Sequence, residues 1–176
     1  MQPNIIKSAM LNGLIMGVLF SINFLCSLSQ ITAIILLSYI LMIYILVAVY
    51  RSTVKFRDVE CNGVITYSKA FSYVLLTFFF ASLISSIAKF VYFQFVNPNY
   101  LDTIFQESMK MLQKMKFPID DESMKQVESM LKPASFSLQF IWINVFIGSL
   151  VGLIMAVFIK KDKSVFAENN ESQNNA

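Results

Sequence analysis

Few side chains in this sequence have the chemistry of a catalytic or ion-binding site. Its 176 residues include two cysteines, Cys26 and Cys61, and no histidine. A cysteine nucleophile needs a neighbouring base, and no recognisable motif supplies one to either thiol. The acidic triplet 120–122 lacks the alternating pattern of a calcium loop, and a solvated helix start explains it better. We therefore predict that the protein is not an enzyme and uses no metal or other cofactor.

Lys89 is the one charged residue within four long apolar runs, which cover residues 9–28, 31–50, 70–96 and 135–159. Ionisable residues inside a membrane span usually mark a pathway or a binding site. Lys89 lies 19 residues after residue 70, which is about 28 Å along a helix. This places it at the membrane boundary, so we predict an interface anchor whose long side chain reaches the headgroups. The aromatic belt expected at this depth consists of Tyr92, Phe93, Phe95 and Tyr100. The alternative is a site for a substrate or a lipid phosphate.

The four runs set the class of protein. Each reaches the roughly 20 residues that a helix needs to cross a hydrocarbon core about 30 Å thick. Hydrophobic residues make up 56% of the chain and charged residues only 14%, and the formal charge of +3 is too small to suggest nucleic acid. We predict an all-α integral membrane four-helix bundle, a single domain over residues 1–163, followed by a disordered cytoplasmic tail at 164–176.

The first run could instead be a secretory signal, because Ser27 and Ser29 form a small-x-small pattern after an apolar stretch. Two features favour a span. The run is longer than a typical signal core, and polar or small residues such as Asn12 and Asn23 interrupt it in the way of a packed helix.

The basic residues predict the orientation. Eight of them lie close to the ends of the spans on one side: Lys7, Arg51, Lys55, Arg57, Lys69, Lys160, Lys161 and Lys163. Basic residues near span ends favour the cytoplasmic side. We therefore expect both termini in the cytoplasm of a cell whose cytoplasmic (inner) membrane holds the protein, and the 97–134 segment outside. Cys26 and Cys61 then lie on opposite sides of the membrane and cannot pair.

Two runs carry small residues at four-residue spacing, which places them along one helix face. They are Gly13, Gly17 and Ser21 in the first run and Gly148, Gly152 and Ala156 in the fourth. Small side chains let two helices approach closely in lipid. We predict that these two faces pack on each other within one bundle, and the alternative is an interface to a second copy or another partner.

The 97–134 segment reads as an amphipathic helical hairpin between the third and fourth spans. Apolar residues recur at three- and four-residue steps over 100–115, Pro118 breaks this pattern, and Pro133 ends a second one before the fourth run. The two helices can pack together, lie on the bilayer, or close over the bundle. Their methionines would also suit a partner surface. We therefore expect the hairpin to contact either the lipid bilayer or a membrane protein partner.

Three stretches, GVITYSKAF at 63–71, YFQFVNP at 92–98 and FIGSL at 146–150, give the chain a familiar pattern. It resembles the bacterial membrane proteins catalogued as domain of unknown function 4199, over nearly the full length. The resemblance implies a small four-span protein of a bacterial cytoplasmic membrane and no particular activity. The outer segment of that family commonly has a Gly-containing turn, where this chain has residues 117–119 (FPI). We expect a non-enzymatic structural or partner-binding component, and the alternative is a small-solute permease or channel subunit.

Overall fold

A computed structural model of the 176-residue chain describes residues 4–115 and 120–161. Its helices are α1 (Ile5–Ser27), α2 (Thr32–Glu60), α3 (Tyr67–Val91), which continues as the π-helix η1 (Tyr92–Val96), α4 (Asn99–Lys114), α5 (Asp121–Met130) and α6 (Pro133–Ile159). Four of these segments, α1, α2, α3 with η1, and α6, are long and apolar enough to cross a membrane. The predicted all-α architecture with four spans is confirmed. Pro118 and the predicted tail at 164–176 lie outside the described residues.

The second span is longer than the sequence predicts. It was expected to end at residue 50, but α2 continues to Glu60. No Gly or Pro interrupts residues 51–60, whereas Asn62 and Gly63 follow with φ angles of 53° and 77°. Such positive φ angles end a right-handed helix. The last turns of α2 therefore carry basic residues that lie beyond the predicted end of the second span.

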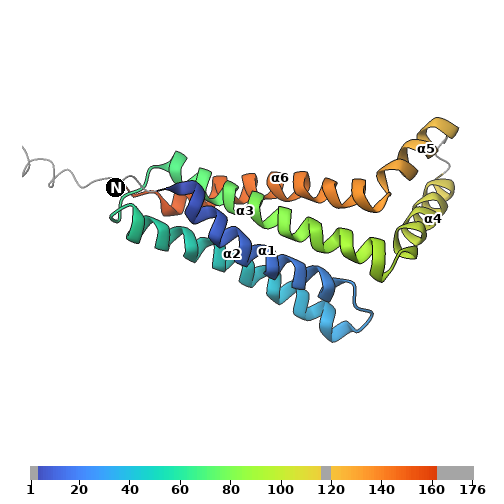
Figure 1. The fold of residues 1–176 in the computed structure, drawn as a ribbon, viewed down its shortest axis with the longest axis horizontal. Helices are drawn as coiled ribbons and strands as arrows, with labels where there is room; N and C mark the ends of the chain where they lie inside the picture. Colours follow the sequence, from blue (N-terminus) through green and yellow to red (C-terminus); the bar gives the residue numbers. More distant parts are fainter. Residues whose placement is uncertain (1–3, 116–119, 162–176) are drawn as a thin grey trace, which may run out of the picture.

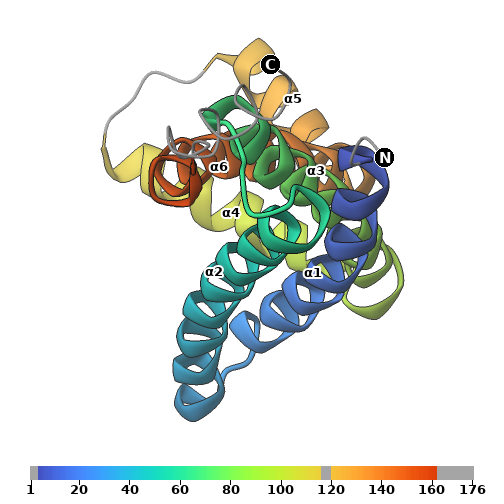
Figure 2. The same ribbon diagram turned by 90° about the vertical axis from the view of Figure 1, so that its left-hand side faces the viewer.

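α3 is the central helix of the bundle. It makes its largest contacts with α1 and with α6, while α2 packs mainly on α1. We call the end where α1 begins and α6 ends the proximal end, and the end with the α1–α2 turn and α4 the distal end (Figure 1). Figure 2 shows the helices from the proximal end, with the α1–α2 hairpin diverging from α6. The bundle is therefore closed at its proximal end and splayed at its distal end.

Gly13 and Gly17 bring α1 into close contact with α3. A Cβ atom at Gly13 would lie 2.5 Å from the Cβ of Phe80, and one at Gly17 would lie 2.6 Å from the Cβ of Ile84. Any side chain at these positions would force the helices apart. Ser21 follows on the same face, and its hydroxyl donates a hydrogen bond to the Gly17 carbonyl oxygen at 2.8 Å.

Gly148 and Gly152 allow the same close approach between α6 and α3. A Cβ at Gly148 would lie 2.5 Å from the Cβ of Phe78, and one at Gly152 would lie 3.2 Å from Cδ2 of Phe71. Ala156 continues this face and is fully buried in the core cluster at the proximal end. Both partners of these glycines are residues of α3.

These contacts correct the predicted pairing of the two small-residue faces. Each face packs on α3, and the two faces do not pack on each other. A stripe of small residues determines how closely a helix can approach a neighbour, but it does not determine which neighbour that is. Since both stripes are covered within one chain, neither presents its glycines to a second copy.

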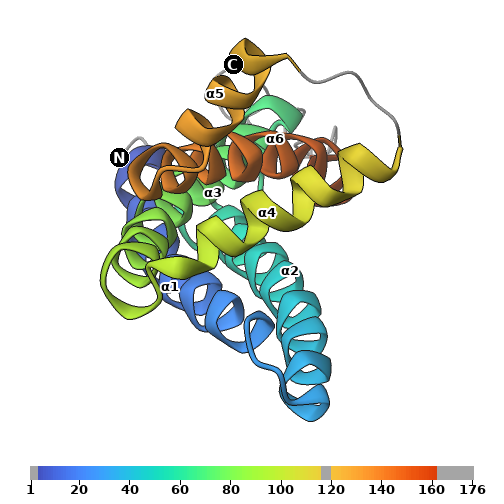
Figure 3. The same cartoon turned by 90° about the vertical axis from the view of Figure 1, so that its right-hand side faces the viewer.

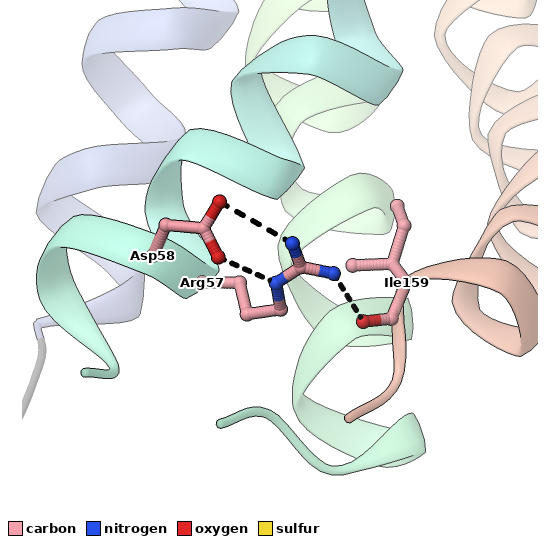
Figure 4. A network of polar contacts seen from close by, with 3 residues as sticks. All are labelled: Arg57, Asp58 and Ile159. Atoms are coloured by element: carbon pink, nitrogen blue, oxygen red, sulfur yellow. Dashed lines mark hydrogen bonds and ion pairs between the residues drawn. The ribbon is translucent and has the colours of Figure 1, made fainter. Parts of the chain in front are cut away.

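The proximal end is held together by contacts between α2, the α2–α3 loop and the end of α6. Nη1 of Arg57 donates to the carbonyl oxygen of Ile159 at 3.2 Å, and Nε of Arg57 lies 2.7 Å from Oδ1 of Asp58 (Figure 4). Ile65 and Lys161 exchange two backbone hydrogen bonds of 3.0 Å. The end of the last span is thereby fixed to the second span and to the start of the third.

Candidate functional site

Lys89 is buried between three helices near the distal end. Its side chain is 6% exposed, and Nζ donates a hydrogen bond to Oγ of Ser85 at 2.6 Å. The same Nζ lies 5.2 Å from the ring centroid of Phe24 on α1 and 4.5 Å from that of Phe140 on α6. The ammonium group therefore connects α3 to both of its neighbours.

This geometry corrects the side-chain direction expected of an interface anchor. Helical side chains lean toward the N-terminus of their own helix, and the N-terminus of α3 is at the proximal end. The stem of Lys89 accordingly runs back one turn to Ser85, into the bundle and away from the nearby helix end. A side chain that reaches out to headgroups would have to run the other way. The role of Lys89 at the membrane interface stays a prediction.

Aromatic rings take the place of a counter-ion. Within residues 4–115 and 120–161, Lys89 has no carboxylate partner, and α1, α3 and α6 contain no Asp or Glu. A desolvated cation over an aromatic face gains about 2 kcal/mol or more. Two rings from opposite neighbours, Phe24 and Phe140, thus offset part of the cost of burying this charge.

Tyr92 belongs to an aromatic cluster next to Lys89, which we call the distal aromatic cluster. Its members are Phe24, Tyr92, Phe93, Tyr100, Phe136 and Phe140, linked by ring contacts of 5.2 to 6.3 Å. They come from α1, η1, α4 and α6, so the cluster joins the spans to α4. Burial raises the pKa of the Tyr100 phenol above its ordinary value, with further contributions from Tyr92 and Glu107. The phenol therefore stays neutral at physiological pH.

The predicted aromatic belt coincides with this cluster only in part. Tyr92, Phe93 and Tyr100 are members, whereas Phe95 is exposed. Sequence reasoning missed the three phenylalanines of α1 and α6. Within an apolar run, a phenylalanine that faces a buried cation has no local signal that distinguishes it from one that faces lipid.

Hydroxyl groups along α3 form a buried polar stripe that consists of Thr77, Ser82, Ser85 and Ser86. Thr77 and Ser82 donate to carbonyl oxygens of their own helix. Ser86 donates to the carbonyl oxygen of Ser137 on α6 at 2.6 Å, while the buried Oγ of Ser137 has no hydrogen-bond partner among the described residues. Most of the stripe is thus used for hydrogen bonds within the bundle, which is the usual role of such groups in spans.

α4 and α5 project from the distal end of the bundle. α4 runs across this end, and α5 lies on the side of α6 (Figure 3). In the described part of the chain they do not pack along their lengths. They approach each other at a pocket of about 210 Å³, lined by residues 98, 101, 102 and 105 near the start of α4 and by residues 128 and 131–133 around the end of α5. The predicted helices are present, but the tight antiparallel packing that was one of three expected arrangements is not.

The match to a known family covers most of this structure. A family model described as "Protein of unknown function (DUF4199)" matches residues 11–161. This range runs from the second turn of α1 through the last residue of α6 to the bridge at Lys161. The chain belongs to this family. Neither a curated protein nor a solved structure matches the chain. The family resemblance expected from the sequence is confirmed.

Proposed function

We propose that this protein is a non-enzymatic, multi-pass component of a bacterial cytoplasmic membrane that binds another integral membrane protein through α4 and α5. The observation that carries the proposal is a set of exposed methionines on these two helices or directly after α4: Met111, Met115, Met124 and Met130. Met111 and Met115 are 65% and 66% exposed. Flexible, polarizable methionine side chains suit adaptable binding surfaces.

The position of the two helices supports a partner within the membrane. Two residues separate η1 from α4, and two separate α5 from α6. Such short connections fix the start of α4 and the end of α5 to the ends of the spans, and α4 runs across the distal end from there (Figure 3). A partner that contacts the exposed methionines must therefore present an apolar surface at the same level relative to the membrane, as another multi-pass protein does.

Site-specific photocrosslinking in intact cells tests this proposal. A photoreactive amino acid at position 115 is expected to give one protein adduct of defined mass, because Met115 is exposed. The matched control is position 113 on the opposite side of α4, where Gln113 is also exposed. The adduct should disappear when Met111 is replaced by Glu. Adducts with lipid alone, or equal adducts from both positions, would contradict a protein partner.

The alternative function is a small-solute permease or channel subunit. Liposomes that contain the purified protein distinguish the two. Solute-specific flux above that of empty liposomes would contradict the partner-binding proposal. The hydrogen bonds along α3 argue against a solute path and so favour the partner-binding proposal. Hydroxyls that bond within the bundle are not free to line such a path.

The proposed orientation places the proximal end in the cytoplasm. Cys61 follows α2 at this end, so a membrane-impermeant thiol reagent should leave it unlabelled in intact cells and label it after lysis. A Cys26→Ser background ensures that the signal comes from Cys61. Labelling without lysis would reverse the orientation and would place α4 and α5 in the cytoplasm.

A further inference from the structure

A polar pocket lies between α1, α2 and α3 at the proximal end. It measures about 250 Å³ and is lined by Ser8, Leu11, Asn12, Ser52, Lys55, Phe56, Val59, Glu60 and Tyr73. A second hollow of about 280 Å³, lined by Asn4, Lys7, Ser8, Leu11 and Glu60, adjoins it. Ser8, Leu11 and Glu60 belong to both, so the two hollows form one groove, which we call the proximal groove.

The floor of the proximal groove is rigid and carries hydrogen-bonding groups. Tyr73 is fully buried, and its ring stacks on Phe56 with 4.3 Å between centroids. The Asn12 amide donates a hydrogen bond to the Tyr73 hydroxyl and another, of 3.1 Å, to the Ser8 carbonyl oxygen. The hydroxyls of Ser8 and Ser52 also line the floor. The Ser52 hydroxyl donates to the Val49 carbonyl oxygen at 2.9 Å, so the donors that a ligand in the groove would meet are the hydroxyls of Ser8 and Tyr73.

Two lysines from different helices flank this floor. Lys7 of α1 and Lys55 of α2 are exposed at the rim. The one carboxylate in the lining is Glu60, so the charged side chains of the groove sum to +1. Ammonium groups combined with hydroxyl donors bind phosphate well, because each ionised partner strengthens the hydrogen bond.

The groove also opens onto apolar surface. Leu11 and Val59 are exposed at its edge, and further exposed apolar residues of α1, Leu14, Ile15 and Val18, continue from it along the helix. A ligand that fills the groove would thus have a phosphate at one end and hydrocarbon at the other. Basic pockets between spans are known to bind the headgroups of anionic lipids.

We propose that the proximal groove is a binding site for the phosphate headgroup of an anionic phospholipid. Lys7 and Lys55 hold the phosphate between them, and the hydroxyls of Ser8 and Tyr73 donate to its oxygens. The carboxylate of Glu60 accepts hydrogen bonds from headgroup hydroxyls, as in a glycerol headgroup. The acyl chains lie against the exposed apolar residues of α1.

Native mass spectrometry of the purified protein tests this site. After transfer from bilayers of phosphatidylcholine with phosphatidylglycerol, the wild type should retain one phosphatidylglycerol molecule. Replacing Lys7 and Lys55 with Gln should lower the affinity by about fivefold per lysine, from the usual contribution of a basic residue near a membrane. Both side chains are exposed, so the variant is expected to fold. Tyr73→Phe removes one donor from the floor and should weaken retention without changing the charge.

Arg51→Gln is the matched control. Arg51 is exposed on α2, one turn before Lys55, and does not line the groove. Its loss changes the charge of the proximal end as much as the loss of either lysine alone and should leave lipid retention at the wild-type level. Equal loss in the control would overturn the proposal, because it would mean general attraction to a basic surface. Preference for phosphatidylethanolamine, or displacement of the lipid by soluble glycerol phosphate at comparable concentration, would overturn it as well.

Discussion

Gly148 of α6 lies directly against the side chain of Phe78 of α3, so that a Cβ at this position would be 2.5 Å from the Cβ of Phe78. At Gly152, one turn further along, the nearest atom is the edge of the Phe71 ring at 3.2 Å. The first contact involves a carbon fixed to the backbone, and the second involves a ring that can rotate. The two glycines therefore differ in how strictly the packing excludes a side chain.

We expect Gly148→Ala to lower the free energy of unfolding by about 1–3 kcal/mol, the usual range for overpacking. Gly152→Ala should be close to neutral, because the better helix propensity of Ala, about 1 kcal/mol, offsets a small shift of the Phe71 ring. Denaturant titration in mixed micelles measures both values. A change in oligomer size with unchanged stability in Gly148→Ala would show that this face serves an intermolecular contact instead.

The ammonium of Lys89 and the ring of Phe140 are expected to be coupled. In a double-mutant cycle, Phe140→Leu should cost about 0.5–2 kcal/mol more in the wild type than in a Lys89→Met background, because only the wild type loses a cation over an aromatic face. The free energies of unfolding of the four proteins give the coupling. Additive effects would mean that Phe140 contributes apolar packing alone.

The Cys61 thiol should react as a partly buried group. Burial raises its pKa above the ordinary value, while the charge of Lys69 acts in the opposite direction. A raised pKa means less thiolate at a given pH, so alkylation of the folded protein should reach half its maximal rate at a higher pH than that of the denatured chain. Rates of iodoacetamide alkylation between neutral and alkaline pH, in a Cys26→Ser background, measure this shift. Lys69→Gln should shift the profile further upward, and a profile identical to that of the denatured chain would refute the burial of the thiol.

Arg57 should protect the joined chain segments at the proximal end from hydrogen exchange. Arg57→Gln removes the 3.2 Å bond to the Ile159 carbonyl oxygen. One such bond contributes about 1 kcal/mol, so exchange of the paired Ile65 and Lys161 amides should accelerate by about fivefold. Asp58→Asn keeps the bond to Ile159 and serves as the control. Equal acceleration in both variants would assign the effect to the Arg57–Asp58 ion pair.

Local signals in the sequence predicted the helices well. Run length identified the four spans, and Pro133 marked the boundary between the second outer helix and the fourth span. Contacts between helices were less predictable. The small-residue stripes did not reveal α3 as their common partner, and the position of Lys89 near a helix end did not reveal that its side chain runs inward.

The proximal groove could not be predicted from the sequence for a related reason. Its floor combines Ser8, Asn12, Ser52 and Tyr73 from three helices, and each residue alone is an ordinary member of a span or its flank. Only the packing of α1 and α2 on α3 brings them together. Polar residues that come from three helices, with tens of residues between one helix and the next, carry no periodic signal that a single sequence can reveal.

The central place of α3 has a consequence for the biogenesis of this protein. Of its two main neighbours, α1 precedes it in the chain and α6 follows it. When α3 has just entered the bilayer, Phe24 is already present to contact Lys89, but Phe140 is not yet synthesised. Ser86 likewise still lacks its acceptor, the carbonyl oxygen of Ser137. The nascent chain holds a half-covered cation in the membrane until its last span arrives, so chains that stop before α6 should be preferred substrates for membrane quality-control proteases.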